Sequence, residues 1–283
     1  MNKHRWTEEE KQFLNSNYPT KGAQYCADKL SLRVEQIRAT VNRLKIVVTK
    51  DRKSKVQRMR ATRPRPELCG VPANTFLECK TPEAAYVLGF IWADGCLLKT
   101  KGDRITVEIT HDDWVELHDV FMKTGKWVTA HRTRSNRRPQ SSFITTNKSL
   151  FTYLKENDYV EKSYKSADKI LSCLPDNLKP LWFRGFFDGD GGFYIKSGKY
   201  CQMSFAGSYE QDWSFLTNLL NNLGLNYKIT QHIYKANKYS VVRSSSRHDV
   251  KIFGKYIYNE FDNIGLGRKY NKWINLFRDD LLS

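Results

Sequence analysis

The sequence predicts an α+β protein in which two copies of an αββαββα unit follow a small three-helix domain. Three observations lead to this prediction. A seven-residue motif at Gly89–Gly95 recurs at Gly185–Gly191 with an offset of 96 residues, and the copies agree at four of seven positions. The residues after each copy alternate between apolar and polar, which is typical of half-buried strands. A stretch near the N-terminus instead carries apolar residues at helical spacing. A repeat of this length is too long for a solenoid unit and indicates two fused copies of one small domain.

Residues 1–48 are predicted to form the three-helix domain. Thr7 is followed by three glutamates, a pattern typical of a capping box with acidic residues in the first helical turn. Gly22 opens a second short helix, and Ser31 is expected to cap a third. The third helix has one apolar stripe and an opposite face suited to base edges and phosphates. The stripe comprises Val34, Ile37, Val41 and Leu44, and the DNA-binding candidates on the other face are Arg38, Asn42 and Arg43.

Residues 49–80 are predicted to form an extended basic linker. From residue 51 to 80 there are eight Lys and Arg against three Asp and Glu, and few apolar residues precede Glu67. Three prolines also favour an extended chain: Pro64, Pro66 and Pro72. The linker is either a solvated tether or a tether that lies along phosphates. Its candidate phosphate contacts are Arg52, Lys53 and Arg58.

The composition narrows the class of partner. With 47 Lys and Arg against 30 Asp and Glu, the net charge of +17 favours nucleic acid or an anionic membrane surface. The longest near-continuous apolar run, Tyr86–Ala93, is shorter than the roughly 20 residues that span a bilayer. The first residues lead into no apolar segment, so we expect no secretory signal. The six cysteines include no CxxC pair, which favours reduced thiols in a cytoplasmic protein of a bacterial or phage-infected cell, or in an organelle.

Each repeat is predicted to carry the same order of elements. The first repeat, residues 81–170, begins with a helix at Pro82, and the second, residues 171–283, has its first helix at Pro180 and ends with a C-terminal helix. The strands are expected near 96–99, 104–110, 127–132 and 142–146, and near 192–196, 200–206, 227–232 and 239–244. Since successive side chains of a strand point to opposite faces, one face of each sheet is apolar and the other polar, basic and aromatic.

Two such polar faces side by side would form a long cationic saddle with pseudo-twofold symmetry, suited to a nucleic-acid groove. The candidate contact residues are Arg104, Arg134, Arg137, Arg138, Tyr194, Lys196, Gln202, Lys228 and Arg243.

The first helix of each repeat is apolar until it ends in Asp-Gly, at Asp94-Gly95 and at Asp190-Gly191. Gly is common just past a helix C-terminus, whereas an Asp there is unfavourable because the helix dipole places negative charge at that end. Small residues four apart let two helix backbones approach closely. They are Gly89 and Ala93 on the first helix, and Gly185 and Gly189 on the second. If the helices pack through these residues, the two carboxylates lie side by side and need a divalent cation between them, for which Mg²⁺ is suited.

VLGFIWADG at Val87–Gly95 and FRGFFDGDG at Phe183–Gly191 resemble the paired motifs of the LAGLIDADG homing endonucleases in their single-chain, two-repeat form. The resemblance extends over about residues 80–260. It implies a monomer that cuts both strands of a long double-stranded DNA site, with the helices as the domain interface and the sheets in the major groove. It also implies an origin in an intron or another mobile genetic element.

The resemblance further implies that Asp94 and Asp190 bind the catalytic metals, with the carbonyls of Ala93 and Gly189 as further ligands. Polar or basic residues around the metals would correspond by position to His111, Ser208, Lys148 and Arg243. Two residues depart from the family pattern, Trp92 and Arg184, and both concern packing.

The N-terminal segment, which opens with Trp6 to Glu9, resembles Myb/SANT-like helix-turn-helix modules, whose third helix enters the major groove. Modules of this kind also bind proteins, so a protein-interaction domain is the alternative.

Other functions are considered on the same residues. The run Asp188–Gly191 is similar to the start of an EF-hand loop, but Lys199 stands where that loop requires Glu. A DNA-binding transcription regulator on a LAGLIDADG scaffold stays open, although the loss of the metal-binding acids would be its mark. A maturase that binds intron RNA stays open as well. Protein splicing is not expected, because the sequence opens at Met1 without a splice-junction nucleophile.

Overall fold

The computed structural model describes residues 4, 6–49, 75–99, 103–133, 138–196, 200–235, 237–258 and 264–282. The chain divides into two compact units, Met1–Pro66 and Glu67–Ser283. The division falls inside the stretch predicted to be a linker.

The first unit contains α1 (Glu8–Lys21), α2 (Ala23–Leu30) and α3 (Val34–Arg43). The capping box at the start of α1 is confirmed: Thr7 Oγ1 accepts from the Glu10 amide at 3.2 Å, and the Thr7 amide donates to Glu10 Oε2 at 2.9 Å. The prediction that Ser31 caps α3 is wrong. Ser31 ends α2 in the left-handed conformation, with φ 54°, whereas an N-cap residue needs an extended backbone. Arg33 takes that position instead, and its amide donates to Gln36 Oε1 at 3.0 Å.

Three helices of this unit share a small apolar core. Leu14 from α1, Cys26 from α2 and Ile37 with Val41 from α3 are buried together. The predicted stripe of α3 therefore faces the core through its two central residues. Its opposite face is open to solvent at Arg38, Asn42 and Arg43.

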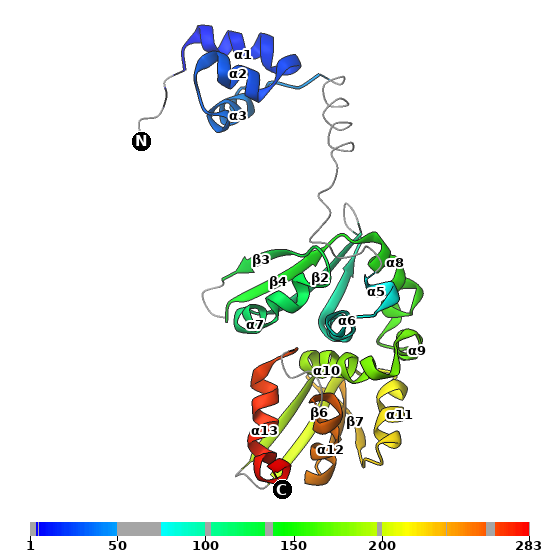
Figure 1. Ribbon diagram of the computed structural model, residues 1–283. Helices are drawn as coiled ribbons and strands as arrows, with labels where there is room; N and C mark the ends of the chain where they lie inside the picture. The colour runs from blue at the N-terminus through cyan, green and yellow to red at the C-terminus, as the bar shows by residue number, and fades with distance from the viewer. Residues whose placement is uncertain are drawn as a thin grey trace. The chain divides into compact units, whose positions relative to one another are not determined.

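The second unit contains the two predicted repeats (Figure 1), and the αββαββα order is confirmed in both. The first repeat comprises α6 (Pro82–Asp94), β1 (Gly95–Leu98), β2 (Arg104–Thr110), α7 (His111–Met122), β3 (Val128–Arg132), β4 (Gln140–Thr145) and α8 (Lys148–Glu156). The second comprises α10 (Lys179–Asp190), β5 (Gly191–Lys196), β6 (Tyr200–Ser208), α11 (Ser214–Asn222), β7 (Lys228–Tyr234), β8 (Asn237–Ser244) and α12 (Arg247–Tyr258), followed by α13 (Gly267–Leu282). Short elements follow α8 and lead to α10: η1 (Tyr159–Glu161), α9 (Asp168–Cys173) and η2 (Asp176–Leu178).

The sheets of the two repeats have the same antiparallel topology. Within the described residues, the strand orders are β1-β2-β4-β3 and β5-β6-β8-β7. Alternate residues of β2 and β6 are buried beneath the helices, among them Ile105, Val107, Met203 and Phe205. The half-buried alternation predicted from the sequence is confirmed, and it leaves one polar face on each sheet.

The core of this unit begins earlier than the predicted linker boundary. A helical turn, α5 (Thr75–Glu78), precedes α6, and Phe76 and Cys79 are buried in the same core as α6. Two apolar side chains here have a place to pack, so the residues just before 81 belong to the folded repeat.

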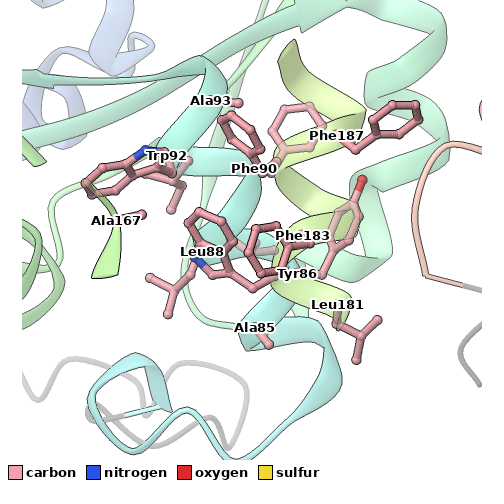
Figure 2. Close-up of a cluster of buried hydrophobic side chains, with 14 of the residues drawn as sticks. Ala85, Tyr86, Leu88, Phe90, Trp92, Ala93, Ala167, Leu181, Phe183 and Phe187 are labelled. Carbon is pink, nitrogen blue, oxygen red and sulfur yellow. The ribbon is translucent and has the colours of Figure 1, made fainter. Parts of the chain in front are cut away.

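The helices α6 and α10 lie against one another at the centre of the unit. A Cβ atom at Gly89 would lie 1.9 Å from the Trp182 carbonyl oxygen, and one at Gly185 would lie 2.0 Å from the Tyr86 carbonyl oxygen. The predicted close approach through small residues is therefore confirmed. Figure 2 shows aromatic side chains of both helices gathered along this contact, including Phe90 and Phe187.

The two departures from the motif pattern are buried in the interface. Trp92 is 2% exposed and its ring contacts those of Tyr159 and Trp182 edgewise or at a tilt. Arg184 is fully buried, with its guanidinium carbon 4.7 Å from the centre of the Tyr258 ring. Both residues thus pack rather than point into a site.

No helix in the described part of the chain combines the length and apolar character needed to cross a membrane.

Candidate functional site

Asp94 and Asp190 meet where α6 and α10 end. Each is the last residue of its helix, and the next residue starts a strand in extended conformation. Gly189 makes the approach possible: a Cβ atom there would lie 2.3 Å from the Ala93 Cβ atom and 3.2 Å from Asp94 Oδ2. The Asp94 carboxylate therefore lies directly against the last turn of α10, as the two motifs predicted.

Burial disfavours the charged form of both carboxylates. Burial, together with the negative charge of Asp94, raises the pKa of Asp190 to about 7. Burial also raises the pKa of Asp94, against the opposing positive charges of Lys162 and Lys269. Carboxylates in such a place hold their charge more readily when a cation is bound between them.

Two lysines that the sequence reasoning missed complete the surroundings of the aspartates. Lys162 follows η1, and its ammonium group donates to the Trp92 carbonyl at 2.6 Å and to the Ala93 carbonyl at 2.7 Å. Lys269, in the first turn of α13, donates to the carbonyls of Phe187 and Asp188, at 2.7 Å each. Each lysine thus donates to main-chain carbonyls at the C-terminal end of one motif helix.

The surroundings of the lysines lower their proton affinity. Burial lowers the pKa of Lys269 to about 8, against the charge of Asp188. Burial likewise lowers the pKa of Lys162, against the charges of Asp190 and Asp94. At neutral pH the site therefore holds ammonium groups that release a proton more readily than an exposed lysine does.

The spacing of the repeated motifs does not predict the lysine pair Lys162 and Lys269. Lys162 lies 68 positions after Asp94, whereas Lys269 lies 79 positions after Asp190, so the common offset of the motifs does not connect them. Lysine is also among the residues most often exposed, and nothing in the local sequence marks either one as buried.

The donor set fits a hard divalent cation. Two adjacent carboxylates with raised pKa values supply charge, and carboxylate, carbonyl and water oxygens are the ligands that Mg²⁺ prefers. Among the described residues, no group of three or more His, Cys, Asp and Glu could hold a metal, so a zinc-type ligand set is not formed there. The predicted ligand carbonyl of Ala93 already accepts from Lys162, which leaves it one lone pair.

The structure places the four accessory candidates as follows. His111 is the first residue of α7; its Nδ1 lies 2.9 Å from Ser141 Oγ and its ring stacks on Trp114. Ser208, at the end of β6, donates to the Ser163 carbonyl at 3.2 Å. Lys148 is exposed at the start of α8, and Arg243 on β8 lies 3.4 Å from His232 Nε2.

The sheet candidates in the second repeat share one face. Tyr194 pairs with Gln202, and Lys228 pairs with Arg243, so strand alternation sets them on the side opposite the core. Tyr194 is 54% exposed. Lys196 is the last residue of β5.

In the first repeat Arg104 begins β2 and Arg138 is exposed before β4. The remaining candidates lie outside the described residues: Arg52, Lys53, Arg58, Arg134 and Arg137.

Comparison with protein families finds a match in the second repeat. Residues 178–265 match the family described as a LAGLIDADG-like domain. This stretch holds the second motif together with both of its hairpins, so the second repeat is similar to that family. The first repeat has the same order of elements.

Comparison with solved structures finds I-DmoI in complex with DNA and Ca, at 17% identity and a TM-score of 0.45, covering 62% of this chain and 88% of that one. It also finds the I-LtrWI LAGLIDADG homing endonuclease bound to target DNA, at 14% identity and a TM-score of 0.46, covering 70% and 90%. I-SmaMI bound to uncleaved DNA with calcium ions matches at 16% identity and a TM-score of 0.45, covering 71% and 92%.

A curated relative is a probable translation initiation factor IF-2 from Methanocaldococcus jannaschii. It is 22% identical over 229 residues, which cover 74% of this chain. The match spans only 17% of the length of that relative.

Proposed function

We propose that this protein is a site-specific DNA endonuclease of the homing type, which makes a double-strand break in a long recognition site with Mg²⁺ as cofactor. The observation that carries the proposal is the meeting of Asp94 and Asp190 at the ends of two helices packed through glycine. The helix dipoles and the mutual repulsion of the two carboxylates oppose their charge at this position, and Lys162 and Lys269 offset only part of that cost, so that the pKa of both stays raised. The LAGLIDADG-like second repeat supports the same activity.

The aspartates and the lysines of the site have different roles in this proposal. Asp94 and Asp190 would hold the metal, with the carbonyls of Ala93 and Gly189 nearby. A bound Mg²⁺ would act as a Lewis acid on the phosphate. The ammonium groups of Lys162 and Lys269 add positive charge beside the aspartates and stabilise charge that develops on phosphate oxygens.

The polar sheet faces are proposed to bind the DNA grooves. Arginine and lysine contact phosphates and base edges there, and tyrosine and glutamine add further hydrogen bonds. The first unit is proposed to be a helix-turn-helix DNA-binding module, since α3 exposes Arg38, Asn42 and Arg43 on the face opposite its buried residues. We further propose that the protein acts as a monomer in the cytoplasm or an organelle, and that it belongs to an intron or similar mobile element.

The test is cleavage of a randomised duplex library with Mg²⁺, followed by sequencing of the cut ends. Wild-type protein is expected to select and cut one site. Asp94→Asn and Asp190→Asn should each abolish the double-strand break while DNA affinity is retained, since neither changes a sheet face. Asp119→Asn, which alters a carboxylate exposed on α7, is the matched control and should cut normally. Binding without any cut by wild-type protein would favour the transcription regulator, and selective binding of intron RNA would favour the maturase.

A further inference from the structure

Each buried lysine is carried by one repeat but is anchored to the other. Lys269 belongs to the second repeat, and the first turn of its helix docks on α7 of the first repeat. Arg268 makes two hydrogen bonds to Asp113, Nε to Oδ1 at 2.7 Å and Nη2 to Oδ2 at 2.9 Å. The Gly267 amide also donates to Glu116 Oε1. Lys269 is the next residue of the same turn and reaches back to the end of α10.

Lys162 is anchored in the reverse direction. It belongs to the first repeat, and its own carbonyl accepts from Gln211 Nε2 of the second repeat at 2.6 Å. The following residues are held in the same way, because Ser208 Oγ donates to the Ser163 carbonyl and the Phe215 amide donates to Ser166 Oγ at 3.1 Å.

The two anchors differ in chemistry. In the first, Asp113 is buried, and although burial acts to raise its pKa, the hydrogen bonds and charge of Arg268 lower it. Paired charges of this kind form the stronger, geometrically fixed contact. In the second anchor, neutral hydrogen bonds from Gln211 and Ser208 hold main-chain carbonyls.

We propose that Arg268 with Asp113 positions Lys269, and that Gln211 positions Lys162, in each case from across the repeat interface. Each lysine would then serve one of two cleavage centres, one for each DNA strand, and an anchor from the opposite repeat would complete each centre. The catalytic consequence rests on the proposed function, whereas the positioning itself does not. An error of about 1 Å in the position of such a group can cost up to about 100-fold in rate. Loss of one anchor should therefore slow one centre and leave the other intact.

The experiment uses the full chain with Arg268→Gln and Gln211→Ala. Two matched controls remove the same groups elsewhere: Arg278→Gln alters an exposed arginine of α13 that bonds Asn275, and Gln231→Ala alters an exposed glutamine that bonds the Tyr209 carbonyl. The first measurement needs no activity. Reductive methylation with formaldehyde, read by mass spectrometry, gives the relative exposure of each lysine amine.

Arg268→Gln is expected to increase methylation of Lys269 several-fold and leave Lys162 as in wild type. Gln211→Ala is expected to increase methylation of Lys162 several-fold and leave Lys269 as in wild type. The second measurement is cleavage of a duplex labelled on both strands. Each variant should slow one strand about tenfold or more and accumulate nicked product, and the two variants should nick opposite strands. Arg268→Lys, which keeps one charged contact to Asp113, should recover part of the loss.

Equal methylation of both lysines in all variants would overturn the positioning roles, whether or not the protein cuts DNA. Equal slowing of both strands would also overturn them, since a general loss of folded protein acts on both centres alike. If wild-type protein cuts no DNA but each variant exposes only its own lysine, the proposed function fails and the positioning stands.

Discussion

The substitution Gly185→Ala tests the interface that brings the two aspartates together. A Cβ atom at this position would lie 2.0 Å from the Tyr86 carbonyl oxygen and 2.8 Å from the Phe90 amide nitrogen, whereas ordinary contact begins at 3.4 Å. Both obstacles are backbone atoms of α6, so no side-chain rotation relieves the clash. The two helices must separate by more than about 1 Å along their contact.

The magnitude follows from two opposing effects. Alanine in a helix interior is favoured over glycine by about 1 kcal/mol, so propensity alone predicts stabilisation. Overpacking costs about 1–3 kcal/mol and occasionally more, and separation of the helices also loosens the aromatic contacts beside them. The backbone obstacles place the cost at the upper end of this range, so we expect a net loss of about 2 kcal/mol. For a folded unit of this size that lowers the Tm by roughly 4–8 °C.

Thermal unfolding followed by circular dichroism measures the loss. Gly192→Ala is the matched control, because a Cβ atom there meets nothing within 4 Å, and its Tm should be equal to wild type or slightly higher. Gly89→Ala should behave as Gly185→Ala does, and the double variant should lose less than the sum, since helices already apart accommodate the second methyl group. A Tm for Gly185→Ala equal to or above that of wild type would refute the close packing of α6 on α10.

Three further predictions concern charge and the first unit. The pKa of Asp190 is raised from 3.8 to about 7, so the folded protein gains a proton that the unfolded chain lacks across this range, and this group makes stability fall as pH rises through it. In the presence of a metal chelator, the Tm of Asp190→Asn should therefore be higher than that of wild type at pH 8 but not near pH 4. A Tm difference between variant and wild type that is the same at both pH values would contradict the raised pKa of Asp190. DNA binding should weaken steeply with salt, at about 0.9 in the log–log slope for each phosphate neutralised, and a slope near zero would mean that the basic faces do not meet DNA. Removal of residues 1–66 should shorten the protected DNA on one flank and weaken binding, yet leave cleavage at high protein concentration, because both aspartates lie in the second unit; an unchanged footprint and affinity would favour a protein-interaction role for the first unit.

The repeated architecture could be predicted from the sequence because it is encoded locally. Apolar alternation marked the strand Arg104–Thr110 to the residue, and helical spacing marked the core of α3. The pairing of Asp94 with Asp190 was also within reach, since small residues four apart on both helices specify where two backbones touch.

Other features depend on neighbours that are distant in the chain. Ser31 has the chemistry of a helix cap, but the packing of α2 on α3 sets it in a left-handed turn. The partners of His111 and Ser208 could not be read from the sequence either: His111 lies within hydrogen-bond distance of Ser141, and Ser208 donates to the Ser163 carbonyl.

The lysines of the site show most clearly what local sequence cannot predict. Local sequence fixes periodicity, and hence which face of an element is apolar, but it does not fix which carbonyls a long flexible side chain will meet. Lys162 and Lys269 are buried because connections of unequal length bring them to the ends of α6 and α10, where they donate to main-chain carbonyls. The sequence alone thus determined the two repeats and the approach of their aspartates. The tertiary structure alone decided which lysine side chains lie beside these aspartates, because the contacts of the lysines join residues about 70 to 80 positions apart.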